Sequence, residues 1–289
     1  MSNLNFKNMQ EMNFEKLFVQ RNPDYEFLLT RMRCALDVEE VTFSDINNIN
    51  MLRFKKYLTD EVSNSSLRTY MAVIAATVKA FAQDDLCRNV DFKTINRIRC
   101  EKTENIALTE EELELFINYY ERIKNHNTVE RDILTVFLLE CLTGARTSDC
   151  EHFDASSISN GFLCYVSKKT HTMTRVPVHR MLPTLLARMP KKEYSRTTKC
   201  RKVKEVAKML GIDKPEKRMY RGKLKTRPRY EYVSTHTGRR SFISLLLDKG
   251  VPLATVSKIA GHQSVSQTLR YYCSEQLVLN DAALSFFNG

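Results

Sequence analysis

The sequence lacks the features that would place the protein in a membrane, outside the cell or around a structural metal ion. No apolar run approaches the ~18 residues of a membrane span, and the opening MSNLNFKNMQEMNF has no apolar signal-peptide core. The eight cysteines are scattered with no C-x-x-C pair, a pattern typical of reduced thiols rather than of a disulfide framework or a zinc site. We therefore expect a cytoplasmic protein without a metal site.

Acidic residues are scarce in one part of the chain. Residues 165–230 hold 21 lysines and arginines against four acids, a local balance of +17. The whole chain carries only +11, so the remainder sums to −6. A solvated basic face would be the simplest interpretation of a charge run. An excess confined to one segment favours a polyanionic partner instead, either DNA or RNA.

The 289 residues, 43% of them hydrophobic, are enough for two domains. Apolar residues recur at helical spacing in TFSDINNINMLRFKKYLTDE and in NSSLRTYMAVIAATVKAFAQDDLC. We therefore predict an all-α domain over residues 1–102, followed by a linker at 103–107. The second domain is predicted over residues 108–289 and begins with a helix, because Thr109 and Glu112 can form a capping box.

The second domain mixes helices with a few strands. TVERDILTVFLLECLTG indicates a buried helix that ends at Gly144. The stretches SSIS, FLCYVSKK and RVPVH, with a turn at Asn160–Gly161, predict a three-stranded antiparallel meander. The basic and aromatic residues 218–234 are expected as loop and irregular strand, and the remainder as helix. The predicted fold class is mainly α with a small antiparallel β-meander, an α+β catalytic domain in a clamp-like two-domain architecture.

A few polar residues stand out against this apolar pattern. His236 and Arg239, in HTGRRSF, precede a buried helix, and Asp149 is placed to hold the guanidinium of Arg146. Each such residue alone is weak evidence, since a lone histidine is usually a satisfied core residue and a lone cation a surface one. The full set of candidates is Arg146, Lys169, His236, Arg239, His262 and Tyr271.

Together these residue types suit one reaction. Two arginines, a lysine and two histidines can neutralise a phosphodiester in its transition state and supply a proton to the leaving hydroxyl. A tyrosine beside them can attack phosphorus and store the bond energy as a covalent ester. Such chemistry needs neither a metal nor a nucleotide cofactor, so no cofactor is predicted.

The order and spacing of these residues resemble the tyrosine recombinases, the phage-integrase family. The resemblance is strong over about residues 107–280 and weaker over SSLRTYMAVIAATVKAFAQDDL, which is similar to the helical core-binding domain of these enzymes. It implies a simple two-domain recombinase, without a separate arm-binding domain. It also implies that Arg146 and Arg239 bind the scissile phosphate and that Tyr271, rather than its neighbour, is the nucleophile.

The resemblance assigns the remaining roles as well. Lys169 is the leading general-acid candidate, because counting back eight residues from Pro177 reaches it and not Lys168. We further expect strand alternation to point the two lysines to opposite faces. His236 and His262 would support phosphate binding and proton transfer. The chain has AGH where leucine-glycine-histidine is more usual, which keeps an apolar residue at that position.

The implied partner is double-stranded DNA carrying short recombination sites, bound by a homotetramer on two duplexes. An accessory DNA-bending protein is a further partner that the sequence leaves open, and the implied location is the nucleoid, in a phage or mobile-element setting. Two alternatives remain: a type IB topoisomerase that relaxes DNA, and a non-catalytic DNA-binding regulator on the same fold. Candidate DNA-binding residues outside the catalytic set are Arg68, Lys79, Lys223, Lys225 and Arg227.

The tail CSEQLVLNDAALSFFNG is too apolar for a free terminus. We predict a tail helix. The resemblance favours docking in trans on a neighbouring protomer, and docking in cis on its own domain remains the alternative.

Overall fold

The computed structural model describes residues 13–81, 90–100, 103–123, 128–220 and 223–273. The predicted tail helix therefore lies outside the described residues. The chain divides into two compact units: residues 1–103 with 220–223, and residues 104–219 with 224–289. Within the described ranges, no helix is long and apolar enough to cross a bilayer.

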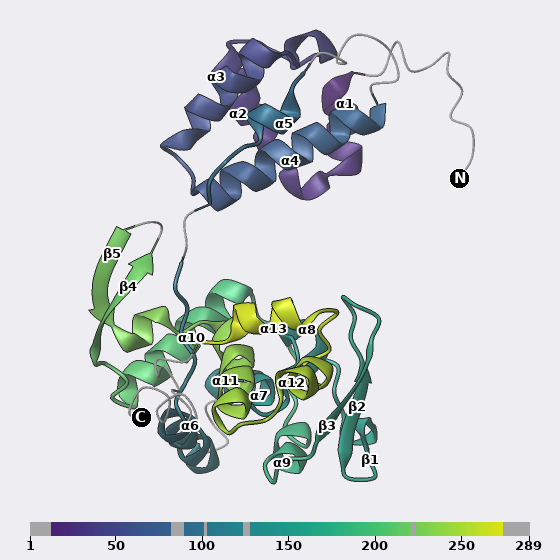
Figure 1. The fold of residues 1–289 in the computed structure, drawn as a ribbon. Coiled ribbons are helices and arrows are strands. Elements are labelled where there is room, and N and C mark those ends of the chain that lie inside the picture. Colours follow the sequence, from purple (N-terminus) through teal and green to yellow (C-terminus); the bar gives the residue numbers. More distant parts are fainter. Residues whose placement is uncertain (1–12, 82–89, 101–102, 124–127, 221–222, 274–289) are drawn as a thin grey trace, which may run out of the picture. The chain divides into compact units, whose positions relative to one another are not determined.

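In the first unit, the described residues between 13 and 100 form helices joined by turns and loops, with no strand among them (Figure 1). Its helices are α1 (Phe14–Arg21), α2 (Phe27–Leu36), α3 (Asn48–Thr59), α4 (Asn64–Phe81) and the short α5 (Phe92–Ile95). One apolar core joins them, with Phe14, Met32, Phe54 and Ile74 fully buried. The all-α character predicted from the helical spacing is confirmed for these residues.

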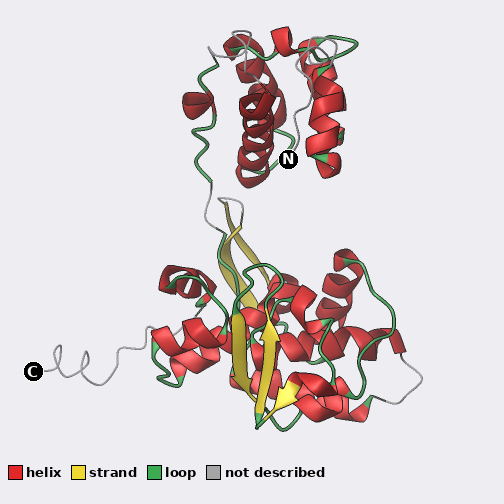
Figure 2. Cartoon of the chain, turned by 90° about the vertical axis from the view of Figure 1, so that its right-hand side faces the viewer, coloured by secondary structure: helices red, strands yellow, loops and turns green. Residues whose placement is uncertain are grey.

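Helices also make up most of the second unit (Figure 2). They are α6 (Glu110–Arg122), α7 (Thr128–Thr143), α8 (Thr147–Cys150), α9 (Leu182–Leu186), α10 (Arg196–Met209), α11 (Thr235–Asp248), α12 (Leu253–Ile259) and α13 (Val265–Tyr271). The Thr109–Glu112 capping box forms as predicted. Gly144 follows α7 with a φ of +66°, which glycine adopts without strain.

Helix α7 lies at the centre of the second unit and packs against α11. The contact is close at Gly238, where an added Cβ would lie 2.8 Å from the Cβ of Glu140 and 3.1 Å from the carbonyl oxygen of Phe137. A glycine between His236 and Arg239 therefore lets the start of α11 approach the backbone of α7. This packing positions the HTGRRSF stretch.

The predicted meander is confirmed. β1 (Ile158–Ser159), β2 (Phe162–Val166) and β3 (Met173–Pro177) form one antiparallel sheet in that order. Asn160 and Gly161 join β1 to β2 with φ values of +49° and +76°, as a two-residue hairpin turn requires.

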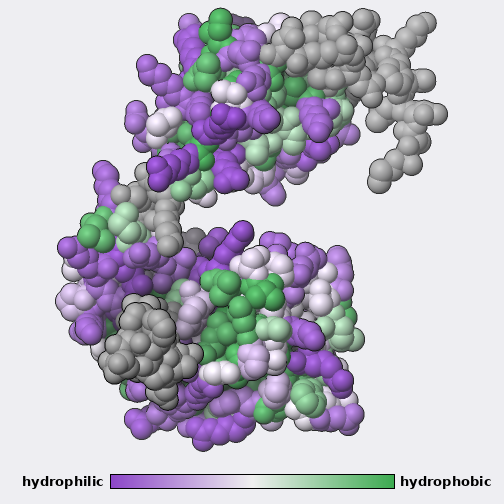
Figure 3. All heavy atoms as spheres, viewed as in Figure 1, coloured by the Kyte–Doolittle hydropathy of each residue, from purple (hydrophilic) through white to green (hydrophobic). Residues whose placement is uncertain are grey.

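The basic stretch after α10 is more regular than predicted. β4 (Pro215–Tyr220) and β5 (Lys223–Pro228) pair into a separate two-stranded sheet where loop and irregular strand were expected. Most side chains of β5 are exposed, so the segment has no run of apolar residues to indicate a strand in the sequence. In the space-filling view, apolar residues gather over α11 and α13 (Figure 3).

Candidate active site

Arg146 lies in the turn between α7 and α8, where it is the N-cap of α8. Its Nη1 donates to Ser167 Oγ at 3.0 Å, and Ser167 Oγ in turn donates to Asp149 Oδ2 at 3.2 Å. Asp149 is therefore linked to Arg146 as the sequence suggested, but through Ser167, which stands between the two side chains. The serine comes from the end of β2, and no local pattern near Arg146 indicates it.

Asp149 also binds the hairpin that carries Lys169. The backbone amide of Lys168 donates to Asp149 Oδ1 at 2.9 Å, and the amide of Ser167 donates to the carbonyl of Thr172 at 3.0 Å. One buried carboxylate thus ties the β2–β3 turn to the Arg146 turn.

Lys169 itself is exposed and lies beyond the end of β2. Strand alternation therefore does not separate Lys168 from Lys169, and that reason for choosing between them is wrong. A different feature distinguishes them: the Lys168 ammonium contacts Nε2 of His152.

Arg239 is 1% exposed on the first half of α11. Its Nη1 donates to the carbonyl of Gly144, and its Nη2 donates to the carbonyl of Ala260 at 2.8 Å. Burial, and then the nearby Arg146 cation, lower the pKa of Arg239. A buried guanidinium bonded to carbonyls retains its charge for an arriving anion.

His262 follows the tight turn at Gly261. Its Nδ1 forms a 2.9 Å hydrogen bond with Thr268 Oγ1, while its Nε2 is buried without a protein partner. Burial, reinforced by Arg239 and Arg146, lowers the pKa of His262 to about 4. The imidazole is therefore neutral at physiological pH in the DNA-free protein.

His236 lies in the first turn of α11 and is half-buried. Burial lowers its pKa first, and the positive charges of Arg240, Arg196, Arg239 and Arg146 add to the effect. Two histidines beside arginines are thus both biased toward the neutral form.

Tyr271 is the last residue of α13. Its ring centroid lies 5.1 Å from the His262 ring and 5.3 Å from the guanidinium carbon of Arg239. The neighbouring Tyr272 is committed elsewhere, because its hydroxyl donates to Asp248 Oδ1 at 2.8 Å. Ser264 is the N-cap residue of α13 but makes no side-chain capping hydrogen bond, and Gln267 Oε1 accepts from the amide of Gln263 instead.

Five of the six predicted site residues thus come together by contact or charge, from the α7–α8 turn, α11 and the α12–α13 region: Arg146, His236, Arg239, His262 and Tyr271. The turn that carries Lys169 is joined to them through Asp149 and Ser167, although no contact among the described residues places the Lys169 side chain itself at the site. The set can bind an anion between two guanidiniums and present a phenol beside it. Sequence reasoning did not include Ser167.

One arginine of the basic segment is buried and paired with acids of its own unit. Arg229 is 5% exposed and binds Glu112 through Nε at 2.6 Å and Nη2 at 3.0 Å, Glu216 through Nη1, and the carbonyl of Ala107 at 2.6 Å. These acceptors raise its pKa despite burial. Arg229 therefore stabilises the second unit and is not available to a polyanion.

The five DNA-binding candidates lie on different elements. Lys223 and Lys225 are exposed on β5, and Arg227 is half-buried with Nη1 3.6 Å from Glu231 Oε2. In the first unit, Arg68 and Lys79 are exposed on α4. Arg68 also lines a groove with Arg21 and Ser65.

Comparison with protein-family models identifies the family of the chain. The family model described as "Phage integrase family" matches residues 107–277. Among curated proteins, no sequence matches the chain significantly.

Solved structures with the same fold are distant in sequence. XerH site-specific recombinase, bound to its palindromic difH substrate in a post-cleavage complex, is 15% identical with a TM-score of 0.60 over 95% of this chain and 80% of that one. Tn1549 transposon integrase, in complex with a circular intermediate DNA, is 12% identical with a TM-score of 0.62 over 96% and 99%. A lambda integrase tetramer bound to a Holliday junction is 15% identical, with a TM-score of 0.64 over 93% of this chain and 78% of that one.

Proposed function

The chain belongs to the phage integrase family, and we propose that it is a site-specific DNA recombinase that uses Tyr271 to cut and rejoin DNA strands. The observation that carries the proposal is the stacking of the Tyr271 ring 5.3 Å from the guanidinium carbon of the buried Arg239. A phosphate held by that guanidinium would lie beside the phenol that attacks it.

The proposed reaction has two reversible halves. Tyr271 Oη attacks the scissile phosphorus and passes its proton to solvent, a 3′-phosphotyrosyl bond forms, and the bond to the 5′ oxygen of the next nucleotide breaks. The departing 5′ oxygen takes a proton, for which Lys169 is the proposed donor. A 5′ hydroxyl from the partner strand then attacks the phosphotyrosyl bond and restores Tyr271.

The other site residues stabilise this exchange. Arg146 and Arg239 neutralise the nonbridging oxygens, whose negative charge grows in the transition state. His236 and His262, biased toward the neutral form, can donate a hydrogen bond to the phosphate or relay a proton. Because the ester to Tyr271 conserves the energy of the broken bond, the cycle requires neither a metal ion nor a nucleotide.

The proposed partner is duplex DNA, and the exposed Lys223 and Lys225 are placed to contact its backbone. Four protomers on two duplexes would complete an exchange, as the lambda integrase tetramer on a Holliday junction illustrates for that protein. An enzyme acting on such sites would work in the cytoplasm, in association with the nucleoid.

The test of function is covalent trapping on a nicked suicide substrate. The expected result is an adduct at Tyr271 with DNA that carries the ends of the phage or mobile element that encodes the protein. No adduct on any such DNA would overturn the proposal. A second assay compares two activities, exchange of strands between two sites and relaxation of a supercoiled plasmid. It separates recombination from topoisomerase activity.

A further inference from the structure

Glu140 is a buried acid that the reaction above does not use. It lies on α7 with 1% of its surface exposed. Its Oε1 accepts a hydrogen bond from the hydroxyl of Thr147, and its Oε2 is buried without a protein partner. Thr147 is the first residue of α8 and directly follows Arg146.

The position of Glu140 places it behind both phosphate-binding arginines. Its link to Thr147 spans the turn that carries Arg146. On the other side, the Cβ of Glu140 lies where a side chain at Gly238 would collide, next to Arg239 on α11. A displacement of this acid would therefore reach both arginines.

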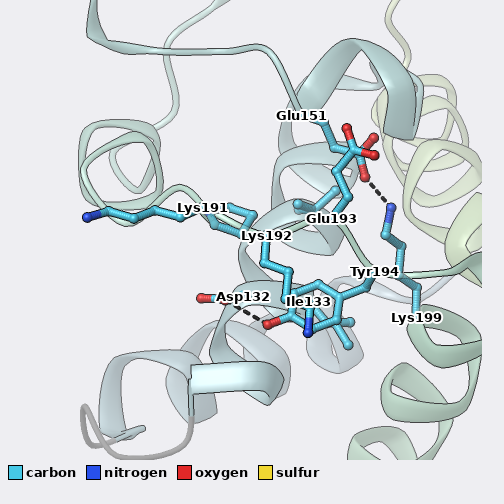
Figure 4. Close-up of a pocket in the computed structure, with 10 residues that line it drawn as sticks. Asp132, Ile133, Glu151, Lys191, Lys192, Glu193, Tyr194 and Lys199 are labelled. Atoms are coloured by element: carbon cyan, nitrogen blue, oxygen red, sulfur yellow. Dashed lines mark hydrogen bonds and ion pairs between the residues drawn. The ribbon is translucent and has the colours of Figure 1, made fainter.

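The charged side chains near Glu140 have other binding partners. Lys199 on α10 forms an ion pair with Glu151 at the end of α8, a contact drawn in Figure 4 at the wall of a neighbouring pocket of about 210 Å³. Arg239 donates to the carbonyls of Gly144 and Ala260. Glu140 also interacts electrostatically with the buried thiols of Cys141 and Cys150.

Burial consequently decides the protonation of this acid. It raises the pKa of Glu140 to about 8, although the Thr147 hydroxyl, Lys199 and Arg239 each act in the opposite direction. At pH 7 the carboxyl is mainly neutral, and it can still accept the Thr147 hydrogen bond.

We propose that Glu140 is a positioning residue for strand cleavage, which holds Thr147 and thereby the Arg146 turn in place against the DNA phosphate. This inference rests on the proposed function. The neutral carboxyl keeps the geometry without offsetting the charge of the arginines. Above pH 8 an anion would form behind Arg239 and Arg146 and weaken the field that stabilises the phosphate in the transition state.

The variants Glu140→Ala and Glu140→Gln separate geometry from charge. Alanine removes the Thr147 acceptor, and we expect single-turnover cleavage of a nicked suicide substrate to fall by about tenfold to a hundredfold at pH 7, the size of effect that misplaced groups produce. Glutamine keeps an acceptor oxygen and should recover most of that loss. Thr147→Val should resemble Glu140→Ala, and Thr147→Ser should resemble the parent protein.

The charge effect is read from the pH dependence between pH 6.5 and 9.5. The ratio of the Glu140→Gln rate to the parent rate should rise through an apparent pKa near 8, because only the parent acquires the anion. The matched control is Glu130→Gln on the same helix, where the buried carboxylate accepts from the Tyr119 hydroxyl at 2.5 Å. Its ratio to the parent should stay flat.

Two results would overturn the inference: a flat ratio for Glu140→Gln, or a folded Glu140→Ala protein that cleaves at the parent rate. If alanine does not fold, the glutamine ratio decides alone. A parent protein that forms no phosphotyrosyl adduct would instead refute the proposed function, so the two failures are distinguishable.

Discussion

The Tyr271 ring packs with its centroid 5.3 Å from the guanidinium carbon of Arg239, so a residue at the end of α13 touches one buried in α11. Cation–π contact of this kind holds the ring in place while leaving the phenol oxygen at its edge. The adjacent Tyr272 points to Asp248 instead. The two tyrosines therefore have separate duties, one at the site and one in the packing of α13.

We predict that Tyr271→Phe abolishes the phosphotyrosyl adduct, because it removes the hydroxyl that would attack phosphorus. Tyr272→Phe should still form the adduct. It should lose only about 0.5–1.5 kcal/mol of unfolding free energy with the hydrogen bond to Asp248. Peptide mapping of the trapped protein–DNA adduct identifies the tyrosine that is linked to DNA. An adduct on Tyr272 would contradict the assignment.

Lys169→Ala should slow cleavage by about 10²–10⁴-fold, since the 5′ oxygen then leaves without its proton donor. A substrate with sulfur at the 5′ bridging position needs no such proton and should restore the rate. Lys168→Ala is the matched control, because its ammonium is engaged by His152. Failure of the sulfur substrate to rescue Lys169→Ala, or rescue of Lys168→Ala in its place, contradicts the general-acid role.

Replacing Lys223, Lys225 and Arg227 together by alanine should flatten the salt dependence of DNA binding. Each lost phosphate contact lowers the slope of log K against log salt by about 0.9, so the expected change is about 2 to 3. It should be equal for specific and random DNA, because backbone contacts carry no sequence information. A fluorescence titration over several salt concentrations measures it, and an unchanged slope would remove β5 from the DNA interface.

Arg229→Met should act on stability and not on that slope. It leaves Glu112 and Glu216 without their shared cation in a buried setting, for which we expect a loss of about 3–5 kcal/mol in urea unfolding. A stable Arg229→Met protein with a flattened salt slope would return this arginine to the DNA-binding set.

The stability of the DNA-free protein should fall as pH drops from about 6.5 to 4, partly through His262. Its pKa is about 4 in the folded chain and 6.5 when exposed, so the unfolded state binds the extra proton in that window. His262→Asn removes this contribution and should narrow the difference in unfolding free energy between pH 7 and pH 4.5. His171→Asn, on an exposed side chain, is the comparison. Equal narrowing in both variants would argue against a buried neutral imidazole.

Local patterns predicted the features that neighbouring residues determine. The Thr109–Glu112 capping box, the end of α7 at Gly144 and the Asn160–Gly161 turn all depend on residues within a few positions of one another. The candidate site was predicted as a set because its residue types suit one reaction and resemble one family.

The rest depends on partners distant in sequence. Arg229 looks like any cation of a basic run until Glu112, 117 residues away, binds it. Ser167 likewise binds Arg146 from 21 residues away. Its backbone amide donates to the carbonyl of Thr172 and closes the turn that contains Lys168 and Lys169. Spacing within one segment carries no signal for such pairs. The strand alternation argued for Lys169 failed for a different reason, because β2 ends at Val166.

The turn at Gly144 links the two arginines mechanically. Its carbonyl accepts Nη1 of Arg239, and it lies two residues before Arg146. A side chain at Gly144 would also collide with the ring of Phe242 on α11. Any shift of α11 toward or away from a bound duplex is thus transmitted to Arg146 through a single peptide unit. Arg146 and Arg239 would therefore move together, and a displacement of one would change the position of the other relative to the phosphate.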